Sequence, residues 1–185
     1  MIDTHCHLFD EEFDIDREDA IKRAIDSGVE KMILVGFSHK TNQLAQEMAK
    51  KWNVFYPTAG LHPSEASLNY LNDFLEFKSF VEKNKVYAVG ECGLDYHWDI
   101  TYKEEQKKLF RLQCEYAIKK DLPIVVHSRD AAQDTYDHNR HSTGPFEHPR
   151  YIEEIIQENH QKFHTEYFYN RWKDDFPHQP YTESP

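Results

Sequence analysis

Residues 122–130 read LPIVVHSRD, and this stretch decides how the chain is expected to fold. An apolar, β-branched run that begins after a proline and ends in polar residues predicts a buried β-strand. His127, Arg129 and Asp130 stand at its carboxyl end. The segment therefore predicts a buried strand that presents chemically active side chains at one edge of a sheet.

Two earlier segments share this pattern. Residues 2–7 read IDTHCH and residues 86–91 read VYAVGE, so each has an apolar stretch that ends in an imidazole or a carboxylate. Strand ends from distant parts of a chain are where metal clusters are commonly assembled. We therefore expect a metal centre formed by four side chains: His5, His7, Glu91 and His127.

Strand and helix patterns alternate along the chain. Strands are expected at residues 2–7, 31–37, 54–60, 86–91 and 122–127, and helices at 20–25, 41–52, 70–82 and 102–120. This alternation predicts parallel strands joined by right-handed crossovers. Polar groups at nearly every strand end favour a (β/α)8 TIM barrel, while an open, doubly wound sheet would more often show a glycine-rich phosphate loop. No such loop is present, so we expect an α/β fold of the TIM-barrel type.

The pattern stops near residue 137. A TIM barrel takes about 250 residues, yet residues 138–185 contain no further apolar strand and only one helical pattern, at 151–158. We therefore expect an incomplete barrel of about five βα units in residues 1–137. Residues 138–185 would form an atypical tail, whose composition suits disorder, a shifted reading frame or a truncated gene product.

Charge and cysteine content restrict the function. A net charge of −11 argues against broad attraction to nucleic acid or to an anionic membrane, so a phosphate substrate would need a local cation such as a bound divalent metal. Three widely spaced cysteines suit a reducing compartment. With no signal-peptide pattern and no run long enough to cross a membrane, we expect a cytoplasmic protein without a membrane partner.

The candidate ligands have alternative explanations. His5 and His7 are two residues apart, so on a strand both imidazoles project from one face, and Asp3 could orient one of them. By itself the pair also fits a structural role. Glu91 lies beside Gly90 and could bridge two cations, or could be a solvated loop residue. Cys6 and Cys92 are expected to be buried rather than ligating.

Other polar residues suggest a substrate site. We expect His62 to donate a hydrogen bond to a substrate phosphate rather than to bind metal. Asp95 and Tyr96, on the segment after Glu91, are predicted to support the cluster or line a pocket, and ordinary loop packing is the alternative. Arg129 suits bidentate phosphate binding unless it pairs with Asp130. Trp98 is a candidate substrate wall.

Four motifs taken together resemble those of the TatD family of metal-dependent hydrolases. They are residues 2–8 (IDTHCHL), 60–63 (GLHP), 90–96 (GECGLDY) and 124–130 (IVVHSRD). The resemblance covers residues 1–137. It implies a TIM-barrel deoxyribonuclease of the amidohydrolase superfamily, which uses two divalent ions to direct water onto DNA ends with 3'-to-5' exonuclease action.

The resemblance also implies roles at matching positions. His5, His7, Glu91 and His127 would bind metal, with Glu91 shared between the ions, and His62 would lie near the scissile phosphate. Glu91 and His62 are thus the expected catalytic residues, and the expected substrate-binding residues are His62, Asp95, Tyr96 and Arg129. The family has a further metal-binding histidine after the position of His127 and a late Glu-Thr-Asp, and this sequence has neither.

Three hypotheses follow. The first is a TatD-type nuclease acting on DNA ends, with two Mg2+ or Mn2+ ions favoured and Zn2+ as the alternative. The second is a catalytically impaired barrel fragment that self-associates through an exposed sheet edge. The third keeps the metal chemistry but takes a small phosphoester or amide as substrate.

Overall fold

Five parallel strands and five α-helices make up the described part of the chain. The computed structural model describes residues 1–141, with side chains for residues 1–137. The strands are β1 (Ile2–Cys6), β2 (Lys31–Leu34), β3 (Phe55–Pro57), β4 (Val89–Asp95) and β5 (Ile124–Arg129). The helices are α1 (Arg17–Asp26), α2 (His39–Lys51), α3 (Tyr70–Lys83), α4 (Lys103–Lys120) and α5 (Ala132–His141), with short 3-10 turns η1 (Glu11–Phe13) and η2 (Pro63–Glu65).

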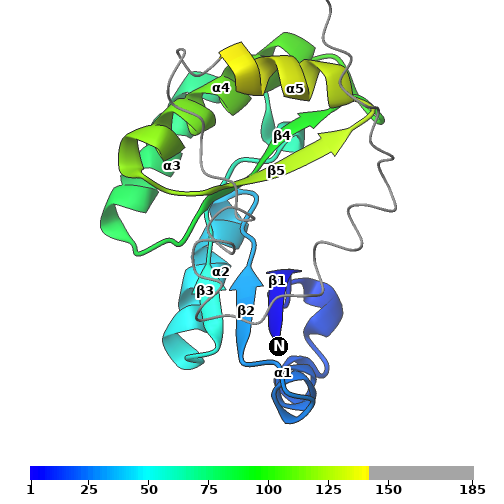
Figure 1. Cartoon of the computed structure of the whole chain (residues 1–185), viewed down its shortest axis with the longest axis vertical. Coiled ribbons are helices and arrows are strands. Elements are labelled where there is room, and N and C mark those ends of the chain that lie inside the picture. Colours follow the sequence, from blue (N-terminus) through cyan, green and yellow to red (C-terminus); the bar gives the residue numbers. More distant parts are fainter. Residues whose placement is uncertain (142–185) are drawn as a thin grey trace, which may run out of the picture.

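The strands follow one another in sequence order. One sheet has the order β1-β2-β3, the other pairs β4 with β5, and an isolated parallel bridge between Ala59 and Val89 links them (Figure 1). All described pairs are parallel. The predicted α/β fold with parallel strands is therefore confirmed. Sequential order without a reversal is what a barrel requires, and the barrel itself stays a prediction.

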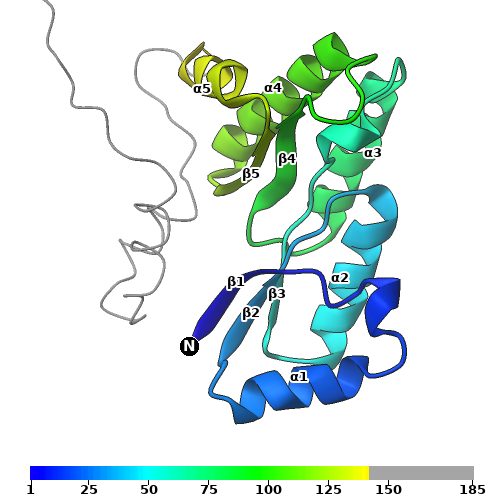
Figure 2. The ribbon, with the colours of Figure 1, turned by 90° about the vertical axis from the view of Figure 1, so that its right-hand side faces the viewer.

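Helices cover the strands because each has one apolar face. Figure 2 shows α2 and α3 on the same side of the strands. The first core cluster packs α1 and α2 on β1–β3 around Ile21, Met32 and Leu34. Within the described residues, no helix is both long and apolar enough to cross a bilayer.

The packing of β4 and β5 decides which side chains face the site. Cys92 and Leu94 of β4 and Ile124 of β5 are buried in a cluster with Phe110 of α4. Successive residues of a strand point to opposite faces. The residues that alternate with these buried ones along β4 and β5 therefore face away from the helices. The sheet face opposite α4 therefore presents the polar residues of β4 and β5: Glu91, Asp95, His127 and Arg129.

Several bounds differ from expectation, and β2 and β3 end at Leu34 and Pro57 instead of residues 37 and 60. β4 begins three residues later than predicted and continues to Asp95, so Glu91 lies within the strand and not at its end. α5 was not expected, because residues 132–141 contain few apolar positions at helical spacing. The predictions for residues 138–185, including the helix at 151–158, lie outside the residues described here, except that α5 extends to residue 141.

Candidate metal centre

The structure brings the four predicted ligands together. His5 Nε2 lies 3.1 Å from His7 Nε2 and 3.6 Å from Glu91 Oε2, and His7 Nε2 lies 4.0 Å from the same oxygen. On the other side of the carboxylate, Glu91 Oε1 lies 3.2 Å from His127 Nδ1. One strand of the first sheet, β1 with the residue just after it, and both strands of the second sheet thus contribute to a single cluster, and its role as a metal centre stays a prediction.

A backbone carbonyl orients His7. The ring nitrogen Nδ1 of His7 donates to the carbonyl oxygen of Val35 at 2.9 Å, which leaves Nε2 directed at the cluster. Burial, then the field of His5, lowers the pKa of His7, which favours the neutral ligand form. The predicted orienting group, Asp3, instead accepts the backbone N–H of His5 at 3.1 Å. The second ring nitrogen of His7 is therefore held by a main-chain carbonyl just after β2, the kind of contact that orients a metal-binding histidine.

Gly93 allows β4 to approach β5 closely. It pairs in register with His127, its φ is +148°, and a Cβ there would overlap the carbonyl oxygen of His127. Only glycine adopts such a φ without strain. This close approach helps to place the Glu91 carboxylate next to the His127 ring.

His127 lies between two carboxylates. Its Nδ1 faces Glu91, and its Nε2 lies 3.1 Å from Asp95 Oδ2. The hydrogen bond with Glu91, reinforced by that with Asp95, raises the pKa of His127 against the opposing effect of burial. Burial opposes ionisation of Glu91, yet hydrogen bonds from His127 and His5 outweigh it and hold the pKa of Glu91 well below its usual value. Both carboxylates therefore favour the protonated form of His127.

His62 is held with its proton toward the cluster. Its Nδ1 accepts the backbone N–H of Ser64 at 3.1 Å, and its ring centroid lies 4.2 Å from that of His127. Burial, then the field of His127, lowers the pKa of His62 to about 4, so the ring is neutral at pH 7. A neutral imidazole whose Nδ1 accepts carries its proton on Nε2. His62 also comes within 4.8 Å of ligand atoms of Glu91 and His127, but a protonated Nε2 suits a hydrogen-bond donor better than a ligand.

Two residues that position His62 were not identified from the sequence. Asn42 of α2 is fully buried and pairs through its amide with both the N–H and the carbonyl of Gly60, at 3.1 and 3.0 Å. Gln113 of α4 is also fully buried and pairs in the same way with Leu61, at 2.8 and 3.0 Å. Their only sequence signal is a polar residue on a helix face that is otherwise apolar. Together they hold the backbone immediately before His62.

The other predicted substrate residues have partners within the chain. Besides its contact with His127, Asp95 accepts the backbone N–H of His97 at 2.9 Å. Tyr96 donates its hydroxyl proton to Asp134 of α5 at 2.8 Å. Asp130 lies 2.7 Å from His97 Nδ1, so the alternative pairing of Asp130 with Arg129 is absent among the described residues. The contacts of Asp95 favour an orienting role, and its predicted contact with substrate stays untested.

The thiols lie away from the cluster. Cys6 Sγ donates to the carbonyl oxygen of Ile33 at 3.3 Å, and Cys92 is fully buried on the helix side of β4. Burial raises the pKa of Cys6 to about 12, which disfavours the thiolate form that binds metal. These contacts agree with the expectation that neither thiol is a ligand.

The residues at the cluster fit a divalent cation. Nitrogen and oxygen ligands about 2.1 Å from one ion stand roughly 3.0–3.4 Å apart in octahedral or tetrahedral geometry. The separation of His5 Nε2 and His7 Nε2 lies in this range, and the distances to Glu91 exceed it by a few tenths of an ångström. A mixture of imidazoles and carboxylate suits Mn2+ and Zn2+, and the carboxylate also suits Mg2+.

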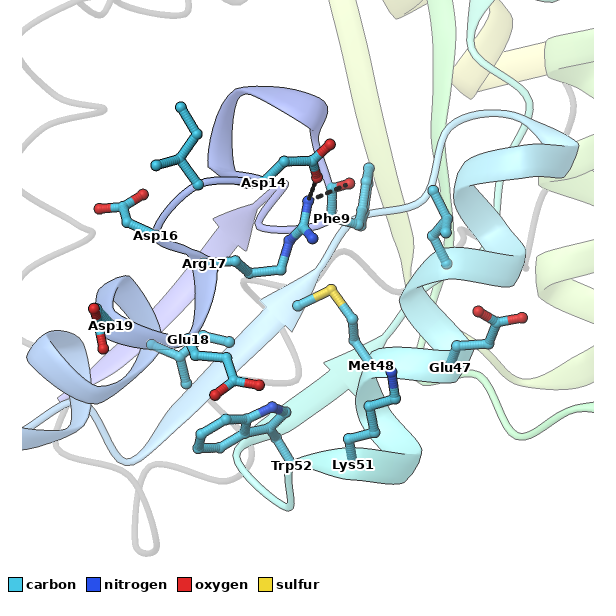
Figure 3. Close-up of a pocket in the computed structure, with 13 residues that line it drawn as sticks. Phe9, Asp14, Asp16, Arg17, Glu18, Asp19, Glu47, Met48, Lys51 and Trp52 are labelled. Atoms are coloured by element: carbon cyan, nitrogen blue, oxygen red, sulfur yellow. Dashed lines mark hydrogen bonds and ion pairs between the residues drawn. The ribbon is translucent and has the colours of Figure 1, made fainter.

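A separate cavity lies between α1 and α2. Its volume is about 550 Å³, and its lining includes Trp52 and several acidic residues (Figure 3). None of the lining residues belongs to the metal centre. The guanidinium of Arg17, which also lines this cavity, is already bound to the carboxylate of Asp14 and to main-chain carbonyls. Lys51 is a second cation in the lining, and the cavity shares no residue with the cluster of His5, His7, Glu91 and His127.

Comparisons with known proteins agree with this geometry. The family model described as "TatD related DNase" matches residues 2–162. An uncharacterized metal-dependent hydrolase, YabD, of Bacillus subtilis is 41% identical over 134 residues, which is 72% of this chain and 52% of that protein. A 3'-5' ssDNA/RNA exonuclease TatD of Shigella flexneri is 32% identical over 131 residues, 71% of this chain and 50% of that protein. The chain thus spans about half the length of the curated relatives it matches.

Solved structures show the same similarity. The TatD homologue YjjV of Escherichia coli superposes with a TM-score of 0.69 and 31% identity, covering 77% of this chain and 56% of that chain. A TatD-family hydrolase of Entamoeba histolytica gives a TM-score of 0.68 at 26% identity, covering 77% of this chain and 54% of that one.

Proposed function

Because the chain belongs to the TatD-related DNase family, we propose that it is a metal-dependent hydrolase that cleaves phosphodiester bonds at the ends of nucleic acid strands. The observation that supports this most directly is the convergence of three imidazoles on the Glu91 carboxylate. The relative from Shigella flexneri, named for exonuclease action on single-stranded DNA and RNA, supports the choice of substrate.

Four residues would hold the metal: His5, His7, Glu91 and His127. Divalent ions bound there would supply Lewis acidity and a water activated at neutral pH. Two oxygens of Glu91 face different histidines, which supports shared ligation by this carboxylate. The Asp95 carboxylate accepts a hydrogen bond from the His127 ring and so would orient that ligand. The carbonyl oxygen of Val35 accepts one from the His7 ring and would orient it in the same way.

His62 and Arg129 would act on the substrate phosphate. The Nε2–H of His62 can donate to a phosphate oxygen while the ring stays neutral at pH 7. Arg129 stands two residues after His127 on the same strand face, and its guanidinium suits an adjacent phosphate. The net charge of −11 would otherwise repel this substrate, so binding is expected to depend on metal.

The test uses the full chain with Mn2+, Mg2+ or Zn2+, a 3'-labelled and a 5'-labelled single-stranded DNA, and small phosphoesters and amides. We expect metal-dependent shortening of DNA that stops with EDTA and is lost in Glu91→Gln. Glu47→Gln is the matched control, since Glu47 is an exposed residue of α2 outside the cluster.

Three results would contradict the proposal. A folded, metal-loaded chain that cleaves no DNA would indicate an impaired fragment. Faster cleavage of small esters or amides than of DNA would indicate the other substrate class. Activity that persists in Glu91→Gln would remove the cluster from the reaction.

A further inference from the structure

We propose that Trp98 and Arg129 form a stacking platform for an unpaired nucleobase of the substrate strand, next to the metal centre. This inference rests on the proposed function and adds a substrate feature to it. The indole of Trp98 is 77% exposed, and the guanidinium of Arg129 lies 5.2 Å from its ring centroid. An exposed indole beside a cation is the kind of surface on which proteins stack bases of single strands.

The position of Arg129 connects the platform to the metal centre. Ile124 and Val126 pack toward α4, and Ser128 Oγ lies 3.0 Å from Thr135 Oγ1 of α5, so His127 and Arg129 share the opposite face. Two residues along a strand advance by roughly 6.6 Å. Arg129 is therefore one step further toward the strand end than His127, and its guanidinium carries the platform to the Trp98 ring, 5.2 Å away.

The local charges leave Arg129 available. Among residues 1–137 its guanidinium forms no hydrogen bond or ion pair, although the neighbouring loop is acidic. The carboxylate of Asp130 lies 2.7 Å from His97 Nδ1, and that of Asp95 contacts His127 Nε2. The carboxylate of Asp99 accepts the backbone N–H of Thr101. Each of these carboxylates thus has a hydrogen-bond partner other than Arg129. Arg129 acts on Asp95 only through its charge, so its guanidinium can bind a phosphate while its flat face contacts the indole.

The loop also holds the indole in place. The His97 ring packs edge-on against Trp98 with centroids 4.6 Å apart, and His97 is itself tied to Asp130 at the end of β5. A ring oriented before binding loses less freedom when a base stacks on it. A base paired within a duplex already has both faces covered, so the platform selects single strands.

The test compares two short strands with phosphorothioate linkages, which resist hydrolysis. One carries thymine bases and the other carries abasic sugars, and both are titrated into the full chain with Mn2+ while tryptophan emission is recorded. We expect the thymine strand, but not the abasic strand, to quench an emission component that is missing in Trp98→Ala. That variant should bind the thymine strand about five- to 150-fold more weakly and the abasic strand as the wild type does.

Two further variants complete the test. Arg129→Met should weaken binding of both strands, because it removes the phosphate contact as well as the stack. Leu75→Ala, which truncates an exposed side chain of α3, should change neither. Equal affinity of wild type and Trp98→Ala for the thymine strand, or equal losses for both strands, would overturn the platform. Metal-dependent cleavage of ordinary DNA by the same preparation separates the two proposals. Cleavage without selective binding of the thymine strand would overturn only the platform, and selective binding without cleavage would overturn only the proposed hydrolase activity.

Discussion

Glu91 Oε1 lies 3.2 Å from His127 Nδ1, across the pairing of β4 with β5. The contact joins two residues 36 positions apart and sets the protonation of both. It raises the pKa of the imidazole and lowers that of the carboxylate, so each side chain favours the charged form of the other. Metal and proton are therefore expected to compete for His127.

Metal binding should release protons from His127. Because the pKa of His127 lies above its usual 6.5, the ring stays protonated to higher pH, and a metal must displace that proton. The affinity for Mn2+ should thus fall as the pH falls. Calorimetric titration at pH 6 and pH 8, in buffers of different ionisation enthalpy, measures the protons released. His127→Gln should bind more weakly and release fewer protons, and an unchanged release would show that another group titrates.

The free energy of unfolding should fall between pH 6.5 and about pH 4 because of His62. Its pKa is about 4 in the folded chain and near 6.5 when unfolded, so the unfolded state takes up the proton first as the pH falls. The contribution of His62 is complete above pH 6.5. Urea unfolding of metal-free protein at several pH values tests this. The fall in the free energy of unfolding between pH 6.5 and about pH 4 should be smaller in His62→Gln. An identical fall in the variant would contradict the lowered pKa of His62.

The same urea experiment should show that His127 contributes a free energy of unfolding with the opposite pH dependence. Its raised pKa contributes stability that is present below pH 6.5 and is lost as the pH rises through the folded value. Metal-free His127→Gln should therefore lose this decline on the alkaline side. A decline that remains unchanged in the variant would assign it to other groups.

Removal of the Asn42 amide should destabilise the chain and displace His62. Asn42→Ala leaves the N–H and carbonyl of Gly60 unpaired in the core, which is expected to cost about 2–4 kcal/mol. Gln43→Ala is the matched control, because Gln43 is exposed on the same helix and should change stability by less than about 0.5 kcal/mol. Urea melts of both variants give the comparison, and similar losses would show that the buried amide contributes little.

Gly93→Ala should prevent the close pairing of β4 with β5. The new Cβ meets the His127 backbone, and the φ of +148° is strained for alanine, so we expect a loss of at least about 3 kcal/mol or failure to fold. Gly28→Ala is the control, because Gly28 also has a positive φ but has open space around it. Its cost should be only about 1 kcal/mol. Thermal melting followed by circular dichroism distinguishes the two, and equal losses would show that φ alone matters.

The sequence alone determined the order of the elements and the identity of the clustered side chains. Strands and helices have periods of two and 3.6 residues, and these periods are visible within a short window. Parallel order then brings the carboxyl ends of the strands to one edge, which is why His5, His7, Glu91 and His127 could be expected to meet.

Only the tertiary structure decided how these residues work. Contacts across tens of residues give His127 its two carboxylates, hold the backbone before His62 through Asn42 and Gln113, and place Trp98 against Arg129. No local pattern encodes them, because each partner lies on a different element and its distance depends on how the elements pack. The length of β4 and the presence of α5 were missed for the same reason, since packing overrides weak local preference.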